Sequence, residues 1–200
     1  MRAIGIPVHV MVRPRGGDFL YSEREFASML DDVASFRDAG AAGVVFGCLT
    51  ADGAVDETRT RSLAECARPA SANFHRAFDM AADPRAALEA LIRCGIDRVL
   101  TSGQAPTAMD GAALLADLVR QAAGRIIILG CGALRPDTIG QVRRATGLAE
   151  LHFSAQINLA SGMQFRNENL TMGAAANARE FIHIGTDPAL VRATIAAARA

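Results

Sequence analysis

The sequence contains no lysine and no tryptophan, so all 21 of its basic residues are arginines. Schiff-base catalysis needs the amine of a lysine side chain, and its absence therefore excludes the lysine-dependent aldolases. The arginines are balanced by 21 acidic residues, which leaves a net charge of zero at pH 7. Nucleic acids and anionic membrane surfaces usually require a basic excess, so we expect neither as a partner.

Long apolar runs and paired cysteines are also missing. No apolar run approaches the roughly 18 residues of a membrane span, and residues 1–7 are too short for a signal peptide. The four cysteines, Cys48, Cys66, Cys94 and Cys131, are far apart and form no CxxC pair. In a neutral chain without a signal sequence, such cysteines predict reduced thiols and a cytoplasmic protein.

Six short apolar runs recur along the chain. They cover residues 7–13, 43–48, 73–78, 97–101, 125–129 and 150–154. Their starts are roughly 30 residues apart, which leaves room for one helix between consecutive strands of a parallel sheet. A closed (β/α)8 barrel has eight strands. The chain is therefore predicted to be a single α/β domain over residues 1–200, of the TIM-barrel type, with six of the eight βα units present.

Helix signals occupy the intervals between these runs. Ser22 and Glu25 have the spacing of a capping box. Asp83 and Asp187 each precede a proline, which is typical of an N-cap followed by the first helical position. Residues 156–181 do not continue this alternation of strands and helices, because they are polar and their apolar residues show no clear period. We expect an irregular segment there, at the C-terminal face of the barrel.

The end of the first run carries a charged loop. Active sites of βα-barrels lie at the C-terminal ends of the strands, and Arg13, Arg15 and Asp18 occur there beside two glycines. Guanidinium groups bind carboxylates and phosphates through paired hydrogen bonds, and glycines let a ligand approach the backbone. The loop is predicted to bind an anion. An arginine–aspartate ion pair that braces the loop is the alternative for either arginine alone.

The third run ends near His75, Arg76 and Asp79. Strand alternation would place His75 and Asp79 on one side of the sheet and Arg76 on the other. A histidine beside a carboxylate at a strand end fits a general acid and base, or a metal ligand with its hydrogen-bonding partner. The alternative is a core histidine that is merely hydrogen-bonded. We predict catalytic roles for His75 and Asp79 and a ligand-binding role for Arg76.

The last three runs end in small residues, which favours an anion site there. Barrels bind phosphate through backbone amides at the ends of their final strands, although glycine after a strand is also ordinary turn chemistry. The predicted ligand-binding residues of these three strand ends are Thr101, Ser102, Gly103, Gly130, Gly132 and Ser154.

Cysteines are the first candidates for a metal site, because soft thiolates select Cu(I) or Zn. Cys48 and Cys131 follow strands and could converge with His75 or His152, so they are the predicted metal ligands. No known zinc-ligand spacing is present. The alternative is that both cysteines are small buried residues of the core. His9, early in the first run, is expected to be structural.

Together these segments resemble the CutC family of copper-homeostasis proteins. The matching stretches are IPVHVMVRPRGGDF, GVVFGCLT, FHRAFD and DRVLTSG, residues 124–132 and 151–155 and, in the tail, Met163, Arg166-Asn167 and Met172-Gly173. The resemblance implies a cytoplasmic (β/α)8 barrel linked to copper tolerance, with Cu(I) as its metal. It also implies a polar pocket lined by Arg13, Arg15, Asp18, His75, Arg76 and Asp79.

The chain departs from the family pattern in three places. Members of the family normally begin with two further βα units, and most of the cysteines proposed to hold copper in the family lie in these units. Cys131 and Phe153 both stand where glycine is usual. The bulk of Phe153 could obstruct an amide-lined anion site.

Three functional hypotheses follow. The resemblance implies a copper-handling protein that binds Cu(I) through thiolates. The residues themselves favour an enzyme or binding protein for a small anionic metabolite, in which Arg13 and Arg15 clamp the anion and His75 or Asp79 moves a proton. The third hypothesis is a non-functional fragment, because a barrel that lacks two strands has two open edges. The same edges predict a homodimer.

Overall fold

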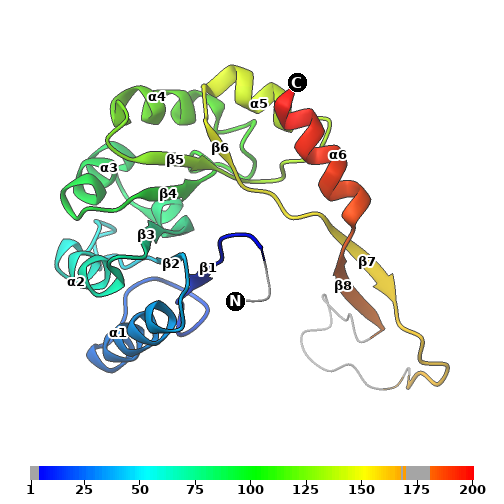
Figure 1. The fold of residues 1–200 in the computed structure, drawn as a ribbon, viewed down its shortest axis with the longest axis horizontal. Helices are drawn as coiled ribbons and strands as arrows, with labels where there is room; N and C mark the ends of the chain where they lie inside the picture. The colour runs from blue at the N-terminus through cyan, green and yellow to red at the C-terminus, as the bar shows by residue number, and fades with distance from the viewer. Residues whose placement is uncertain (1–4, 168, 170–180) are drawn as a thin grey trace.

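The computed structural model describes residues 5–167, 169 and 181–200 of the chain. Six parallel strands form one sheet, in which each strand pairs with its neighbours in sequence (Figure 1). The sheet curls into a half-barrel, which confirms the prediction of six βα units in a TIM-barrel-type α/β fold. The strands are β1 (His9–Met11), β2 (Gly43–Phe46), β3 (Ser71–Phe74), β4 (Arg98–Thr101), β5 (Ile127–Gly130) and β6 (Glu150–Leu151).

The helices α1 to α5 lie along the outside of the half-barrel, and α6 packs beside α5 (Figure 1). The contact between the last two includes a 2.8 Å hydrogen bond from the Arg143 guanidinium to the carbonyl of Ala198. None of the helices that the structure describes combines the length and apolar character needed to span a bilayer. The helices are α1 (Glu23–Asp38), α2 (Glu57–Ala67), the 3-10 helix η1 (Arg76–Met80), α3 (Pro84–Arg93), α4 (Ala112–Ala122), α5 (Ile139–Thr146) and α6 (Pro188–Arg199).

Local signals in the sequence set the starts of three helices. The Ser22 hydroxyl accepts a hydrogen bond from the Glu25 amide, and the Glu25 carboxylate accepts one from the Ser22 amide at 2.7 Å. Asp83 and Asp187 accept from amides in the first turns of α3 and α6, each with proline at the start of the helix. The predicted caps are therefore confirmed, and a cap of this kind stabilises a helix by about 1 kcal/mol.

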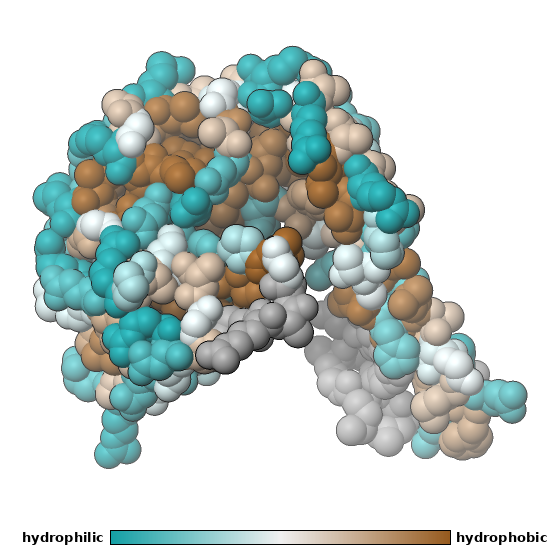
Figure 2. Space-filling model, viewed as in Figure 1, coloured by the Kyte–Doolittle hydropathy of each residue, from teal (hydrophilic) through white to brown (hydrophobic). Residues whose placement is uncertain are grey.

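The two faces of the sheet have different surroundings because side chains alternate along each strand. Val44, Phe46 and Val99 are fully buried beneath the helices. The opposite face surrounds a hollow of about 420 Å³, where apolar residues gather while hydrophilic residues dominate the rim (Figure 2). His9 and Asn73 belong to this inner face, and the His9 Nδ1 atom lies 2.9 Å from the Asn73 Nδ2 atom.

The third strand is shorter than predicted. It ends at Phe74, and the chain then turns into η1. His75 caps this short helix, because its Nδ1 atom accepts a hydrogen bond from the Ala77 amide at 3.2 Å. The prediction that strand alternation places His75 and Asp79 on one side of the sheet is therefore wrong, since Asp79 lies in a helical turn.

The prediction of an irregular segment over residues 156–181 is wrong at its start. β7 (Gln156–Ala160) pairs in antiparallel fashion with β8 (Ile182–Thr186), and the two strands extend away from the body of the half-barrel (Figure 1). The two strands are far apart in the sequence, so no local turn signal announces their pairing. Residues 168 and 170–180, which include the Met172-Gly173 match, lie outside the described residues.

Candidate functional site

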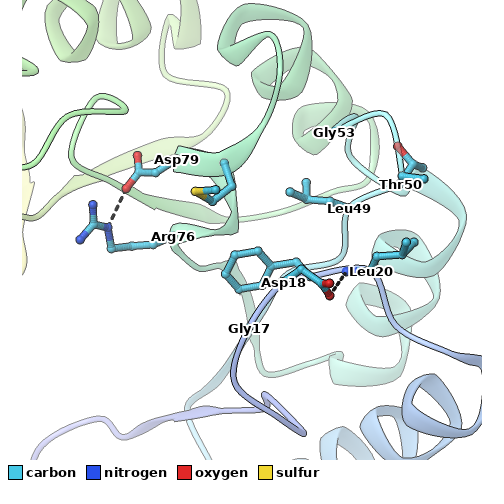
Figure 3. Close-up of a pocket in the computed structure, with 11 residues that line it drawn as sticks. Gly17, Asp18, Leu20, Leu49, Thr50, Gly53, Arg76 and Asp79 are labelled. Carbon is cyan, nitrogen blue, oxygen red and sulfur yellow. Dashed lines mark hydrogen bonds and ion pairs between the residues drawn. The ribbon is translucent and has the colours of Figure 1, made fainter. Parts of the chain in front are cut away.

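Polar residues collect beside a cavity of about 650 Å³ at the C-terminal ends of the strands. The loop after β1, the loop after β2 and η1 form its walls (Figure 3). Arg76 and Asp79 lie at one end of this cavity, and Leu20, Leu49 and Thr50 lie toward the other. Its volume falls in the range of small-molecule pockets, and we call it the larger cavity.

The Asp79 carboxylate joins η1 to the segment that follows β4. Its Oδ1 atom accepts from the Thr101 hydroxyl at 2.5 Å and from the Gln104 amide at 3.2 Å, and the Ser102 amide donates to both oxygens. The Oδ2 atom accepts from Arg76 Nε at 2.6 Å, and the Asp79 side chain is only 8% exposed. These donors fill the acceptor sites of the carboxylate, so Asp79 positions its neighbours in this structure, and its predicted catalytic role stays a prediction.

Arg76 is fixed at two of its three nitrogens. Besides the bond from Nε to Asp79, its Nη2 atom donates to the Ser102 hydroxyl oxygen at 2.7 Å. Its Nη1 atom donates to no acceptor within the described residues, and the side chain is 46% exposed. A guanidinium that is always charged, held in one orientation and left with free N–H groups is a ready site for an anion.

A smaller cavity of about 210 Å³ adjoins Arg76, beyond the ends of β5 and β6. Cys131, Gly132, Arg135, His152 and Ser154 are among the residues that line it. The amides of Gly132 and of the two residues that follow it donate to no acceptor in the part of the chain that the structure describes. Gly132 and Ser154, two of the predicted ligand-binding residues, therefore lie at this cavity, and their binding role stays a prediction.

Arg15 uses its guanidinium within its own loop. Nε donates to Glu25 at 2.7 Å, Nη1 donates to the carbonyls of Gly16 and Asp18, and Nη2 donates to the Asp18 carboxylate and the Leu20 carbonyl. An arginine has five N–H donors, and all five are used here. Arg15 therefore braces the loop, which is the alternative considered for it above, and Asp18 serves as its partner.

Arg13 is less committed than Arg15. Its Nη2 atom donates to the Gly17 carbonyl at 2.8 Å, and the guanidinium lies 4.8 Å from the centre of the Phe19 ring. The side chain is otherwise exposed at the rim. Arg13 thus keeps donors that a ligand could use, but it does not line either of the two cavities described above.

His75 is buried directly behind Phe19, with the two ring centres 5.0 Å apart. Burial, together with the charge of Arg13, lowers the pKa of His75 to about 4. The ring is therefore neutral at pH 7. Because Nδ1 accepts from the Ala77 amide, the proton resides on Nε2, which has no partner within the described residues. In this arrangement the Nε2–H group of His75 is a hydrogen-bond donor, and its predicted catalytic role stays a prediction.

Four predicted ligand-binding residues, Thr101, Ser102, Gly103 and Gly130, pack inside the protein. Thr101 is fully buried and donates its hydroxyl hydrogen to Asp79. A Cβ atom on Gly103 would collide with the carbonyl of Gly111, and one on Gly130 would collide with Leu148. These residues line neither the larger nor the smaller cavity, so they shape the site from behind.

Both predicted metal ligands are buried thiols. Burial raises the pKa of Cys48 to about 12 and that of Cys131 to about 12, so both are protonated near neutral pH. Cys48 belongs to the hydrophobic core, whereas Cys131 lines the smaller cavity with His152. Among the residues that the structure describes, no three histidine, cysteine, aspartate or glutamate side chains cluster as a metal site would require.

Two residues of this face carried no sequence prediction. Gln104 donates its amide N–H to Asp79 and its side-chain amide to the Ala81 carbonyl at 2.7 Å. Arg135 lines the smaller cavity. An arginine shortly after the glycine loop of β5 is a signal that could have identified Arg135, whereas nothing near Gln104 in the sequence indicates its partners.

Comparisons with known proteins agree with the family resemblance. The model of the CutC family matches residues 1–157. A CutC family protein of Mesorhizobium japonicum is 60% identical over 195 residues, which cover 98% of this chain and 76% of that protein. The human copper homeostasis protein cutC homolog is 43% identical over 198 residues, or 99% of this chain and 72% of the human one.

A solved structure has the same architecture. The crystal structure of a CutC protein from Streptococcus agalactiae superposes with a TM-score of 0.72 at 27% sequence identity. The match covers 76% of this chain and 74% of that one. The half-barrel described above therefore corresponds to most of a known fold.

Proposed function

Because the chain belongs to the CutC family, we propose that it acts in copper homeostasis and that its working site binds a small anionic ligand, a phosphate or carboxylate, at Arg76. The first part rests on the names of its relatives, since the human and mouse proteins are called copper homeostasis proteins. The second part rests on the arrangement of Arg76 itself. Its guanidinium is oriented by Asp79 and Ser102, while Nη1 keeps free donors at the wall of both cavities.

Position in the fold also supports this proposal. The free N–H groups of Arg76 lie at the C-terminal ends of the strands, where barrel enzymes and binding proteins hold their ligands. A charge-assisted hydrogen bond to a carboxylate or phosphate is roughly twice as strong as a neutral one. Arg76 is also preorganised, so little side-chain entropy is lost when an anion binds.

Titration with inorganic phosphate and with acetate at low ionic strength tests the anion site. The Arg76→Gln variant should bind at least about tenfold more weakly than the unmodified chain, because it loses a charged donor. Arg120→Gln is the matched control, since Arg120 is an exposed arginine of α4 paired with Asp117. The proposal fails if the unmodified chain binds neither anion at millimolar concentration, or if Arg76→Gln binds as well as the control.

Cu(I) binding is a second candidate, and one observation favours it. The Cys131 thiol and the His152 imidazole line the same small cavity, and these are ligand types that Cu(I) accepts. The metal would have to displace the proton that the raised pKa holds on the thiol, so binding should strengthen as pH rises. Cys48, the other predicted ligand, is enclosed by the hydrophobic core.

Competition with a coloured Cu(I) chelator measures how much each cysteine contributes to the affinity for Cu(I). Cys131→Ser should lower the affinity for Cu(I) at least about tenfold if Cys131 is a ligand, and Cys48→Ser tests the second predicted ligand in the same way. Cys66→Ser is the control, because Cys66 lies on α2. Equal affinities in all variants would remove the cysteines as copper ligands and leave the anion proposal standing.

We also propose that the protein is cytoplasmic and that it forms a homodimer. All four cysteines are free thiols, which is typical of proteins kept in a reducing cytoplasm. Within the described residues, β1 pairs only with β2 and β6 only with β5, and such open edges favour a homodimer. Cell fractionation and analytical ultracentrifugation of the purified chain would test the two statements separately.

A further inference from the structure

Arg76 separates two cavities whose walls differ in chemistry. The larger cavity presents apolar side chains, including Phe19, Leu20, Leu49 and Met80. The smaller cavity has more polar residues in its wall, among them Arg135, His152 and Ser154, beside the apolar side chains of Leu100, Leu134 and Phe153. Figure 3 shows the Arg76 side chain extended so that its guanidinium meets Asp79 at one end of the larger cavity, away from Leu20 and Leu49. The stem of the arginine therefore borders an apolar space, while its charged head lies at the donor-rich side.

The donors of the smaller cavity suit a group with several charged oxygens. Gly132 and Ala133 both have positive φ angles, +111° and +53°. Consecutive amides in such a turn form an anion-binding concavity, and the amides of Gly132, Ala133 and Leu134 donate to no acceptor within the described residues. Arg135, a second arginine, lines the same cavity.

These donors outnumber what a carboxylate can accept. A phosphate monoester carries between one and a half and two negative charges near pH 7 and three strong acceptor oxygens. Two arginines and three free amides match that charge and that number of oxygens better than they match one carboxylate. The shape of the donor set therefore favours a phosphate head group.

We propose that the ligand is an organic phosphate monoester with an apolar or aromatic group. Its phosphate lies in the smaller cavity between Arg76 and Arg135, and its apolar group lies in the larger cavity against Phe19, Leu20 and Met80. This inference rests on the proposed anion site at Arg76 and narrows the class of its ligand. Arg76 lines both cavities and is the lining residue that they share.

Calorimetric titration of the full chain with phenyl phosphate, inorganic phosphate and benzoate tests the inference. Phenyl phosphate should bind at least about tenfold more tightly than inorganic phosphate, because its ring buries apolar surface. Benzoate should bind more weakly than phenyl phosphate, because it leaves amides of the smaller cavity without an acceptor. Equal affinities for phenyl phosphate and inorganic phosphate would overturn the apolar part of the inference while leaving the anion site intact.

Two variants assign the two ends of the ligand. Arg135→Gln should weaken phenyl phosphate and inorganic phosphate by the same factor of about ten. Met80→Ser should lower the affinity for phenyl phosphate toward that for inorganic phosphate and leave inorganic phosphate unchanged. Met80 is 68% exposed, so its replacement leaves the fold intact, and Met109→Ser is the matched control at another exposed methionine.

The outcomes distinguish this inference from the proposed function beneath it. If the unmodified chain binds no phosphate compound and Arg76→Gln changes nothing, the anion site itself is refuted. If Arg76→Gln abolishes phosphate binding but Arg135→Gln and Met80→Ser behave like the Met109→Ser control, the anion site stands and the assignment of the two cavities is wrong.

Discussion

Arg15 and Arg76 occupy comparable places in the fold. Each lies just beyond the C-terminal end of a strand, and each forms an ion pair with an aspartate three residues later, at 2.8 Å for Arg15–Asp18 and 2.6 Å for Arg76–Asp79. The aspartates differ, because the Asp18 side chain is 73% exposed and that of Asp79 is 8% exposed. In the first loop Arg15 forms most of the hydrogen bonds of its pair, whereas in η1 the Asp79 carboxylate forms most of them.

The partner that forms more hydrogen bonds in each pair determines what the other is free to do. Asp79 gathers donors from β4 and the segment after it, so Arg76 needs only two bonds to be held and keeps N–H groups for a ligand. Arg15 donates all five of its N–H groups to oxygens of its own loop and of Glu25. An arginine with an aspartate three residues later thus braces a loop in one place and provides a candidate binding residue in the other.

Replacing Asp79 and Asp18 with alanine should give the largest difference between the two loops, both in the free energy of unfolding and in phosphate affinity. Asp79→Ala leaves the hydroxyl of buried Thr101 and the amide of buried Ser102 without their acceptor, so we expect about 3 kcal/mol less free energy of unfolding. Arg76 also loses its orientation, so phosphate affinity should fall by about tenfold. Urea denaturation and phosphate titration measure the two effects.

Asp18→Ala is the matched substitution in the first loop. Asp18 is largely exposed, and surface ion pairs contribute little. Its urea midpoint and phosphate affinity should stay close to those of the unmodified chain. A midpoint shift as large as that of Asp79→Ala would remove the distinction between the two loops.

His75 links the two regions, because its ring contacts Phe19 of the first loop and caps η1. Its folded-state pKa of about 4 lies below the ordinary value of 6.5. The unfolded chain therefore takes up a proton first as pH falls, and the free energy of unfolding should drop by about 3 kcal/mol between pH 6.5 and pH 4. Urea denaturation at several pH values measures this slope.

His75→Asn tests whether His75 is the origin of that slope. Asparagine keeps an oxygen that can accept the Ala77 amide but does not titrate. The variant should be less dependent on pH in this window, whatever its absolute stability, and His183→Asn on exposed β8 is the control. An unchanged slope in His75→Asn would assign the pH dependence to other groups.

Arg15→Gln should have a smaller effect, confined to stability. The variant loses the bonds to Asp18, Glu25 and the loop carbonyls, so the melting temperature should fall by a few degrees. Because Arg15 lines neither cavity and has no free donor, the affinity for phosphate should not change. Weaker phosphate binding without a change in melting temperature would restore Arg15 to the anion clamp that the sequence suggested.

Features that depend on neighbours in the chain could be predicted from the sequence. The apolar runs located all six strands, and the capping signals at Ser22, Asp83 and Asp187 located three helix starts. These signals act over a few residues. The pairing of β7 with β8 joins strands that are distant in the sequence. The alternation of apolar and polar residues within these strands is too weak to predict them.

The site depends on contacts that the sequence does not display. β3 ends at Phe74 because His75 and Asp79 stabilise a helical turn, and Asp79 finds its donors at Thr101 and Gln104, on another segment. The sequence predicted a functional role for the polar residues of this face, and that role stays a prediction. It could not show which arginine keeps free donors, because that number depends on how the backbone of each loop presents its oxygens.

The smallest expected effect concerns the thiols that flank the two regions. Cys48 follows β2 beside the first loop, and Cys131 follows β5 beside Arg76; burial raises the pKa of each thiol to about 12. Since the thiolate is the reactive form, an aromatic disulfide reagent at pH 8 should modify partly exposed Cys66 first and reach Cys48 and Cys131 only on unfolding. Mass spectrometry of the modified chain identifies the order. Fast modification of Cys131 in the folded chain, but not of Cys48, would show that the smaller cavity is open to reagents of that size and would strengthen the case for Cys131 as a copper ligand.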